Sequence, residues 1–294
     1  MSAGMTGNTI TTTDRGLAFG DGLFETLFVH HGEPVALAEH LTRLRCGLAR
    51  LALPEPGLDP IMAAIDGAVG EESPTGVCKL IVTAGTGPRG YRRPTHPEPT
   101  IRATFGPLPS APPRGLAVDV SPEALSGSAA LRGLKHLNRL TQVLAQEALP
   151  ADHGEALMTD GAGRVVSGTM SNLFWCERGR WHTPPLTDGA IAGTRRAWLI
   201  EALGAEVTPC AVGRLALAEA AFLGNAVSAW RPIVRLLGRD LDAGKPPTAA
   251  LRSLEGFWQP ELPTANRWPA SLSEAMSNTS WGRVARCEGI QETR

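Results

Sequence analysis

The chain has 294 residues, of which 43% are hydrophobic and 19% are charged, so it is long enough for two modest globular domains, each with its own core. Its 28 basic and 29 acidic residues give a net charge of −1, which provides no field for holding nucleic acid or an anionic membrane surface. The five cysteines show no Cys-x-x-Cys spacing, no charged and then apolar leader opens the chain, and no apolar run reaches the roughly 18 residues of a membrane span, so a cytoplasmic protein is expected.

The first hundred residues alternate between strand-like and helix-like patterns. Residues 23–31 read as a strand, and Gly32-Glu33-Pro34 reads as the turn that ends it. The segment after this turn has leucines at three- and four-residue steps, which predict one buried stripe on a helix: Leu37, Leu41, Leu44, Leu48 and Leu51. Residues 77–83 and 101–105 predict two further strands. We therefore expect residues 1–105 to form a small α+β domain.

A proline-rich segment follows this domain. Residues 106–115 contain four prolines, which can join neither a helix interior nor a central strand, so a linker is expected there. Short strands separated by Asp-Gly and Arg-Gly turns come next, with helices after Lys135 and after Gly193. The predicted strands are residues 155–159, 164–166, 172–177 and 181–183. Residues 116–258 are therefore expected to form a second, larger α+β domain.

The end of the chain has a different composition. From about residue 260 onward Pro, Ser, Asn, Trp and Arg alternate without a helical or strand period, so residues 259–294 are expected to be disordered. Three tryptophans are unusual in such a tail, and docking onto a partner subunit is the alternative interpretation: Trp258, Trp268 and Trp281.

One lysine stands in an unusual setting. The segment Gly133-Leu134-Lys135-His136-Leu137-Asn138-Arg139-Leu140 places Lys135 just before a predicted amphipathic helix and among polar residues. A lysine forms a Schiff base with an aldehyde only when desolvation or nearby positive charge lowers its pKa, and Arg139 would lie one helical turn away. The pattern predicts a reactive amine, whereas the ordinary alternative is a solvated surface lysine.

Four segments, taken together and in order, resemble the fold-type IV pyridoxal-phosphate enzymes, and among these the aminodeoxychorismate lyases most closely. The lysine segment is one of them, and the others are RGLAFGDGLFET at residues 15–26, GTMSNLF at 168–174 and AGTRR at 192–196. The resemblance covers about residues 10 to 235. It implies a two-domain α+β fold, with a small N-terminal α/β sandwich and a larger C-terminal domain that binds the cofactor. It also implies a homodimer.

The resemblance implies that Lys135 carries pyridoxal 5'-phosphate. The turn Gly193-Thr194-Arg195 opens a predicted helix at residues 196–202, and the family uses the amides after this glycine to hold the cofactor phosphate. Free amides at the positive end of a helix dipole suit a phosphate, although an ordinary glycine-initiated helix is the alternative.

Two further positions match family residues near the cofactor. Arg43 matches an arginine that contacts the phosphate, and its alternative is a solvated arginine on a helix. Asn225 matches a position close to the cofactor, but an asparagine that caps its own backbone is nearly as good an interpretation.

The chain departs from the family pattern at Ser167. This position usually holds a glutamate that pairs with the protonated pyridine nitrogen and makes the ring a stronger electron sink. A serine can hydrogen-bond to the ring but cannot hold it by charge. Three outcomes are open: the reaction needs less electron withdrawal, another carboxylate replaces the lost one, or the protein has lost its catalytic competence.

A glycine-rich loop in the first domain is the expected substrate-binding element. Residues 87–94 carry three arginines and the chain's one tyrosine, and Arg89 and Tyr91 match the corresponding loop of the lyases. Arginine suits carboxylates, of which 4-amino-4-deoxychorismate has two, while a basic surface turn is the alternative. His136 could relay protons, but a packing or capping role is the commoner one.

The resemblance therefore implies a pyridoxal-phosphate lyase that converts 4-amino-4-deoxychorismate to 4-aminobenzoate and pyruvate in folate synthesis. A class IV aminotransferase for branched-chain or D-amino acids is the first alternative. A cofactor-binding or interaction protein without turnover is the second, because of Ser167 and the unmatched tail. No His-x-x-x-His, Cys-x-x-Cys or Asp-rich spacing argues for a metal, so none is expected.

Overall fold

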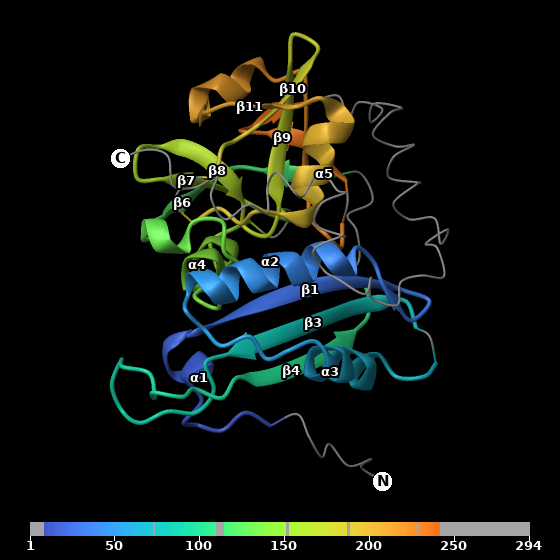
Figure 1. Cartoon of the computed structure of the whole chain (residues 1–294). Helices are drawn as coiled ribbons and strands as arrows, with labels where there is room; N and C mark the ends of the chain where they lie inside the picture. Colours follow the sequence, from blue (N-terminus) through green and yellow to red (C-terminus); the bar gives the residue numbers. More distant parts are fainter. Residues whose placement is uncertain are drawn as a thin grey trace. The chain divides into compact units, whose positions relative to one another are not determined.

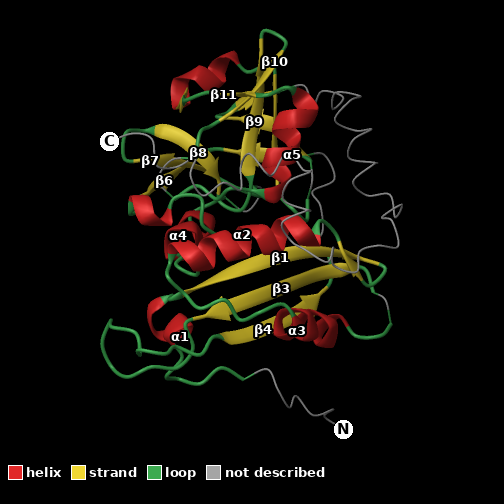
Figure 2. Cartoon of the chain, in the orientation of Figure 1, coloured by secondary structure: helices red, strands yellow, loops and turns green. Residues whose placement is uncertain are grey.

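The computed structural model describes residues 9–72, 74–109, 115–150, 153–186, 189–228 and 230–241. The chain divides into two compact units, of which unit 1 comprises Met1–Pro109 and Lys135–Arg139, and unit 2 comprises Ser110–Leu134 and Leu140–Arg294 (Figure 1). Both units combine helices with sheets, which confirms the expected α+β class (Figure 2). The middle of the predicted linker and the predicted disordered tail, with its three tryptophans, lie outside the described residues.

Unit 1 is built on an antiparallel sheet with the strand order β2-β1-β3-β4. Its elements are α1 (Arg15–Phe19), β1 (Gly22–His30), β2 (Glu33–Pro34), α2 (Leu37–Arg50), α3 (Asp59–Val69), β3 (Gly76–Thr83) and β4 (Thr100–Gly106). Helix α2 packs along β1, and α3 packs beside β4 and β3 (Figure 1). The predicted leucine stripe explains this packing, because Leu41, Leu44 and Leu48 are buried on the same side of α2.

Unit 2 contains two sheets among its described residues. One has the order β11-β10-β9-β13-β14-β15, with β5 paired to β14, and the other has the order β12-β8-β7-β6. The strands before the second helix are β5 (Leu116–Val118), β6 (Val120–Leu125), β7 (Leu157–Asp160), β8 (Arg164–Gly168), β9 (Asn172–Glu177) and β10 (Arg180–Thr183). The later strands are β11 (Glu206–Val207), β12 (Cys210–Ala211), β13 (Ala220–Gly224), β14 (Arg231–Leu236) and β15 (Arg239–Asp240). The helices are η1 (Ala129–Leu131), α4 (Leu140–Glu147), α5 (Thr194–Leu203) and η2 (Val212–Leu217).

The core of unit 2 lies where the two sheets meet. Apolar side chains from β7, β8, β9, β13 and β14 pack into one buried cluster, which includes Leu157, Val165, Leu173, Trp175, Leu223 and Ile233. In β9, the successive residues Leu173, Phe174 and Trp175 are fully buried, so both faces of this strand are covered.

The predicted strands in both units are present with shifts of a few residues at their ends. The chain division differs from the predicted one at one segment, because Lys135–Arg139 belongs to unit 1 and not to the unit formed by the residues around it. The helix predicted after Lys135 is present as α4, but it begins only at Leu140, and residues 135–139 are not helical.

Within the described part of the chain, every helix is too short or too polar to cross a membrane. The same residues contain no group of three or more His, Cys, Asp or Glu side chains that could hold a metal ion. Four of the five cysteines are described, and each of them is a free thiol: Cys46, Cys78, Cys176 and Cys210.

Candidate active site

The segment that carries Lys135 is hydrogen-bonded to the start of β1. The backbone oxygen of Lys135 accepts from Phe24 N at 2.9 Å, and Leu137 N donates to the Gly22 oxygen at 3.0 Å. His136 pairs with Leu23 in an isolated antiparallel bridge. Because these backbone groups are used by β1, they cannot form the i to i+4 bonds of a helix, which is why the predicted helix starts later.

The amine of Lys135 lies over an aromatic ring. Its Nζ is 4.3 Å from the centroid of the Phe24 ring, and Lys79 Nζ is 5.2 Å from the same ring. Burial, followed by the charge of Arg43, lowers the pKa of Lys135 to about 7, and Arg139 and Lys79 act in the same direction. A large share of this amine is therefore neutral near pH 7, which is its nucleophilic form. Arg139 contributes as predicted, although it is not one helical turn away.

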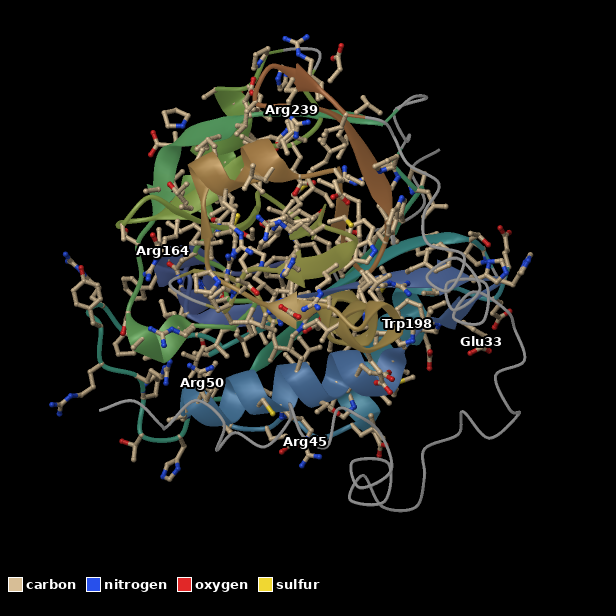
Figure 3. The ribbon with its side chains drawn as sticks, turned by 90° about the horizontal axis from the view of Figure 1, so that it is seen from above. Glu33, Arg45, Arg50, Arg164, Trp198 and Arg239 are labelled. Carbon is tan, nitrogen blue, oxygen red and sulfur yellow. The ribbon has the colours of Figure 1, made fainter. Side chains whose placement is uncertain are left out.

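Arg43 is buried and belongs to a cluster of ionisable side chains under the same sheet. Its Nε donates to Glu25 Oε1 at 2.8 Å, and its Nη2 donates to Glu25 Oε2. His40 Nδ1 lies 2.6 Å from Glu25 Oε2. The alternative of a solvated helix arginine is therefore wrong, because Arg43 is 9% exposed; Arg45 on the same helix is half-exposed and pairs with Glu55 at 2.6 Å (Figure 3).

The charges in this cluster are fixed by its contacts. Burial on its own would raise the pKa of Glu25, but the charge of Arg43 and the hydrogen bond from His40 outweigh it and hold that pKa at about 2. Burial lowers the pKa of His40, so the neutral ring donates its Nδ1 proton to the carboxylate. Glu25 also opposes the lowering of the Lys135 pKa. The cluster thus sets the electrostatic environment of the amine.

The predicted substrate loop has exposed side chains and an anchored backbone. Arg89 is exposed, and Tyr91 is 87% exposed with its ring centroid 5.5 Å from that of Phe19. Arg15 is 3% exposed and holds the loop backbone, because its Nη2 donates to the Tyr91 oxygen at 2.7 Å and its Nη1 donates to the Gly90 oxygen at 3.1 Å. The loop therefore presents its side chains from a fixed backbone.

Asp21 connects this anchor to a second arginine. Arg15 Nε and Arg93 Nε each donate to Asp21 Oδ2 at 2.9 Å. Burial would raise the pKa of Asp21, but the bonds from Arg93 and Arg15 lower it overall. One carboxylate thus connects Arg15, which holds the middle of the loop, and Arg93, near the end of the loop, to the start of β1.

Replacing Asp21 by asparagine is expected to loosen this loop. The Asp21→Asn variant removes the charge that holds the buried Arg15, so amide exchange of residues 87–93 should rise at least about tenfold, the size expected for one lost charge-assisted bond. Hydrogen exchange read by mass spectrometry measures it. The control Asp66→Asn, at an exposed position on α3, should leave the loop unchanged; equal exchange in both variants would show that Asp21 does not anchor the loop.

In unit 2 the predicted phosphate turn opens α5, which starts at Thr194, two residues earlier than expected. Gly193 is its N-cap and forms no side-chain hydrogen bond to the start of the helix. A Cβ at Gly193 would lie 2.1 Å from Asn172 Oδ1, so only glycine fits there. Thr194 and Arg195 are buried, and the Arg195 guanidinium lies over the ring of Trp198, 5.4 Å from its centroid. Burial lowers the pKa of Arg195 to about 9.

Asn225 binds its own turn. Its Oδ1 accepts from Val227 N at 3.0 Å and from Ser228 N at 2.7 Å, and its Nδ2 donates to Ser171 Oγ at 3.0 Å. The structure therefore shows the backbone cap that the sequence left open as the alternative. Ser167 lies buried at the end of β8, one residue before the turn that leads to Ser171.

Several polar residues that bear on the site were not predicted. Glu25 interrupts an apolar strand pattern, and an isolated charge in such a pattern signals a buried partner. Lys79 is exposed on β3 and Glu155 precedes β7, so neither of these residues had such a signal in the sequence. His136 is buried, and burial followed by Arg139 lowers its pKa to about 4, which agrees better with a packing role than with a proton relay near pH 7.

Comparisons with known proteins agree with this arrangement. The sequence pattern of the amino-transferase class IV family matches residues 22–236. The crystal structure of 4-amino-4-deoxychorismate lyase from Pseudomonas aeruginosa is similar, with 35% identity and a TM-score of 0.76 over 87% of this chain and 96% of the lyase. Aminodeoxychorismate lyase from Vibrio harveyi is 28% identical over 198 residues, 66% of this chain and 73% of that protein. D-alanine aminotransferase from Bacillus licheniformis is 26% identical over 245 residues, 79% of this chain and 85% of that protein. The similarity confirms the predicted fold-type IV architecture.

Proposed function

The chain belongs to the amino-transferase class IV family, and on this premise we propose that it is an aminodeoxychorismate lyase, which converts 4-amino-4-deoxychorismate to 4-aminobenzoate and pyruvate in folate biosynthesis. The observation that carries the chemistry is the amine of Lys135, whose pKa of about 7 suits attack on an aldehyde. The choice of the lyase within the family is supported by the 35% identity to the Pseudomonas aeruginosa enzyme over nearly its whole length.

The proposed cofactor is pyridoxal 5'-phosphate, and the side chains present fit it. Lys135 would hold its aldehyde carbon, while the amides of Thr194 and Arg195, at a helix start that Gly193 leaves without a side-chain cap, suit its phosphate. Arg43 matches the family arginine that contacts the phosphate. Because its guanidinium already donates to Glu25, we propose that it acts on the phosphate mainly through its positive charge. When bound, the cofactor ring accepts the electrons released at the amine-bearing carbon of the substrate.

Lys135 has a second role in this proposal. If the substrate amine displaced Lys135 from the cofactor, the freed Lys135 Nζ, as a neutral amine, would remove the proton from the amine-bearing carbon. Cleavage of the bond between the ring carbon and the ether oxygen would release enolpyruvate, which takes up a proton to become pyruvate, and would leave an aromatic ring. Ser167 is proposed to contact the ring nitrogen. The side chain of Asn225 is hydrogen-bonded within its own turn, so we propose that it fixes the conformation of this turn near the cofactor.

Substrate recognition is proposed to rest on positive charge. Arg89 and Tyr91 stand on the anchored loop, where the guanidinium suits one carboxylate of the substrate. Lys79 shares the Phe24 ring with Lys135, and its ammonium is a candidate for the other carboxylate. The protein is further proposed to be a cytoplasmic homodimer.

Capture of the cofactor should depend on pH in a defined way. A protonated amine is not a nucleophile, so the rate at which pyridoxal phosphate combines with the cofactor-free protein should be low in acid and reach half its maximum near pH 7. Arg43 lowers this pKa, so Arg43→Met should move the midpoint to higher pH by about one unit. Stopped-flow absorbance measures the rate. The control Arg45→Met removes a half-exposed arginine from the same helix and should leave the midpoint in place.

The function is tested by pyruvate release. The purified protein, with pyridoxal phosphate, is given enzymatically generated 4-amino-4-deoxychorismate, and pyruvate and 4-aminobenzoate are measured together. Equal release of both products supports the lyase. Formation of pyridoxamine phosphate from branched-chain or D-amino acids, without pyruvate release from the chorismate derivative, would favour the aminotransferase. Bound cofactor without either reaction would favour a protein without turnover.

A further inference from the structure

The turn that joins β8 to β9 is built around a buried carboxylate. Glu155 is fully buried, and its Oε1 accepts from Met170 N at 2.7 Å while its Oε2 accepts from Ser171 Oγ at 3.0 Å. Arg231 Nη2 donates to Glu155 Oε2 and to Ser171 Oγ, the latter at 2.8 Å. A Cβ at Gly168 would lie 2.3 Å from Glu155 Oε1, so the carboxylate reaches this turn only because residue 168 is glycine.

These contacts fix the carbonyl of Gly168. Gly168 N donates to the Ser171 oxygen at 2.7 Å, and Thr169 N donates to the Ala156 oxygen at 3.0 Å. The peptide groups before and after Gly168 are therefore both held by hydrogen bonds. Glu155 and Arg231 hold the far side of the same turn. The orientation of this one carbonyl is therefore set by a network of buried groups and not by the strand alone.

The hydroxyl of Ser167 donates to that carbonyl. Ser167 Oγ lies 2.8 Å from the Gly168 oxygen. A carbonyl oxygen has no proton to give, so the proton in this bond belongs to Ser167. A serine has a single hydroxyl proton, and with that proton engaged its oxygen can only accept from any further partner.

We propose that Ser167 Oγ accepts a hydrogen bond from the protonated ring nitrogen of the bound cofactor, and that Glu155 and Arg231 are the positioning residues that hold it as an acceptor. The inference rests on the proposed function. An unprotonated ring nitrogen would place its lone pair against the lone pairs of Ser167, which is repulsive, whereas a protonated nitrogen donates into them. The chain thus keeps the protonated ring although the family's glutamate is absent.

The position of Glu155 adds to this effect. Its buried carboxylate lies against Gly168, the residue that follows Ser167, and so places negative charge near the acceptor. Arg231 balances that charge and is itself 15% exposed. Of the three outcomes that Ser167 left open, the structure favours replacement of the lost glutamate by a serine acceptor backed by a second carboxylate.

The test reads the protonation state of the ring nitrogen. The protein is loaded with pyridoxal phosphate labelled with ¹⁵N in the ring, and its chemical shift is followed from pH 6 to pH 9. The wild-type protein should show the shift of a protonated ring through neutral pH, and Ser167→Ala should lose its ring proton at a lower pH. Ser167→Thr, which keeps the hydroxyl, should restore the wild-type behaviour, whereas Ser121→Ala, at a buried serine of the same sheet, should not differ from the wild type.

Affinity provides a second measurement. The wild-type protein should bind pyridoxal phosphate at least about tenfold more tightly than its analogue with carbon in place of the ring nitrogen, which is the size of one hydrogen bond to a charged group. This preference should disappear in Ser167→Ala and shrink in Arg231→Met. An unprotonated ring in the wild type, or a preference that survives in Ser167→Ala, would overturn the inference while leaving the proposed function intact. Failure of either cofactor to react with Lys135, seen first as missing visible absorbance, would overturn both.

Discussion

Lys135→Ala is expected to abolish the release of pyruvate from 4-amino-4-deoxychorismate, with a loss of about 10,000-fold or more. General acid–base catalysis alone contributes up to about that factor, and the same side chain is proposed to hold the cofactor covalently. The variant should also lose the visible absorbance of the bound cofactor. The fold should persist, because the segment is held to β1 by backbone bonds of Lys135 and Leu137 that alanine keeps.

Lys79 is the matched comparison for this variant. Its amine lies over the same Phe24 ring as that of Lys135. If nearness to that ring were all that the reaction requires, Lys79 could take the place of Lys135. Lys79→Ala should keep the absorbance and raise the KM for the substrate. Borohydride reduction followed by peptide mapping locates the cofactor adduct. An adduct on Lys79 in the wild-type protein, or unchanged absorbance in Lys135→Ala, would show that the assignment of the lysine is wrong.

The sequence predicted those features of the site that depend on local patterns. The leucine stripe of α2 and the apolar strands follow from periodicity, and the reactive setting of Lys135 follows from a short ordered motif. Their positions relative to one another within unit 1 were not predictable. The helix expected after Lys135 begins only at Leu140, because the backbone of Lys135 and Leu137 pairs with residues 22–24, more than a hundred positions earlier. A long-range backbone pairing overrode the local helical pattern, and no rule that considers one segment at a time describes such a pairing.

The polar partners of the site show the same limit. The sequence identified Arg43 but not Glu25, because the pair depends on how α2 lies across β1. It identified Ser167 as the position that lacks the family's glutamate, but not Glu155, which reaches the turn from the segment before β7 through the space left by Gly168. In both cases the sequence predicted one residue of the site. The charged partner of that residue could not be predicted, because it depends on how two elements pack.

Glu25→Gln is expected to lower the free energy of unfolding by about 3–5 kcal/mol, the range for breaking one side of a buried ion pair. Glu25 is 1% exposed and accepts from Arg43 and His40, so the variant removes the carboxylate that neutralises a buried guanidinium. Glu55→Gln is the control, because its partner Arg45 lies at the surface and such pairs contribute at most about 1 kcal/mol. Urea unfolding at pH 7 measures both.

The pH dependence of this difference identifies its cause. The pKa of Glu25 falls from 4.5 to about 2 on folding, so its stabilising contribution is fully present above pH 4.5 and is lost as the pH falls toward 2. The gap between wild type and Glu25→Gln should therefore narrow by roughly 3 kcal/mol across that window, since each pKa unit corresponds to about 1.4 kcal/mol. A difference in unfolding free energy that stays constant down to pH 2 would mean that the glutamine disturbs packing and not charge.

The same variant should also change the reactivity of Lys135. Because Glu25 raises the pKa of Lys135, Glu25→Gln should capture pyridoxal phosphate with a midpoint below pH 7, which connects the stability of the cluster to the chemistry of the amine.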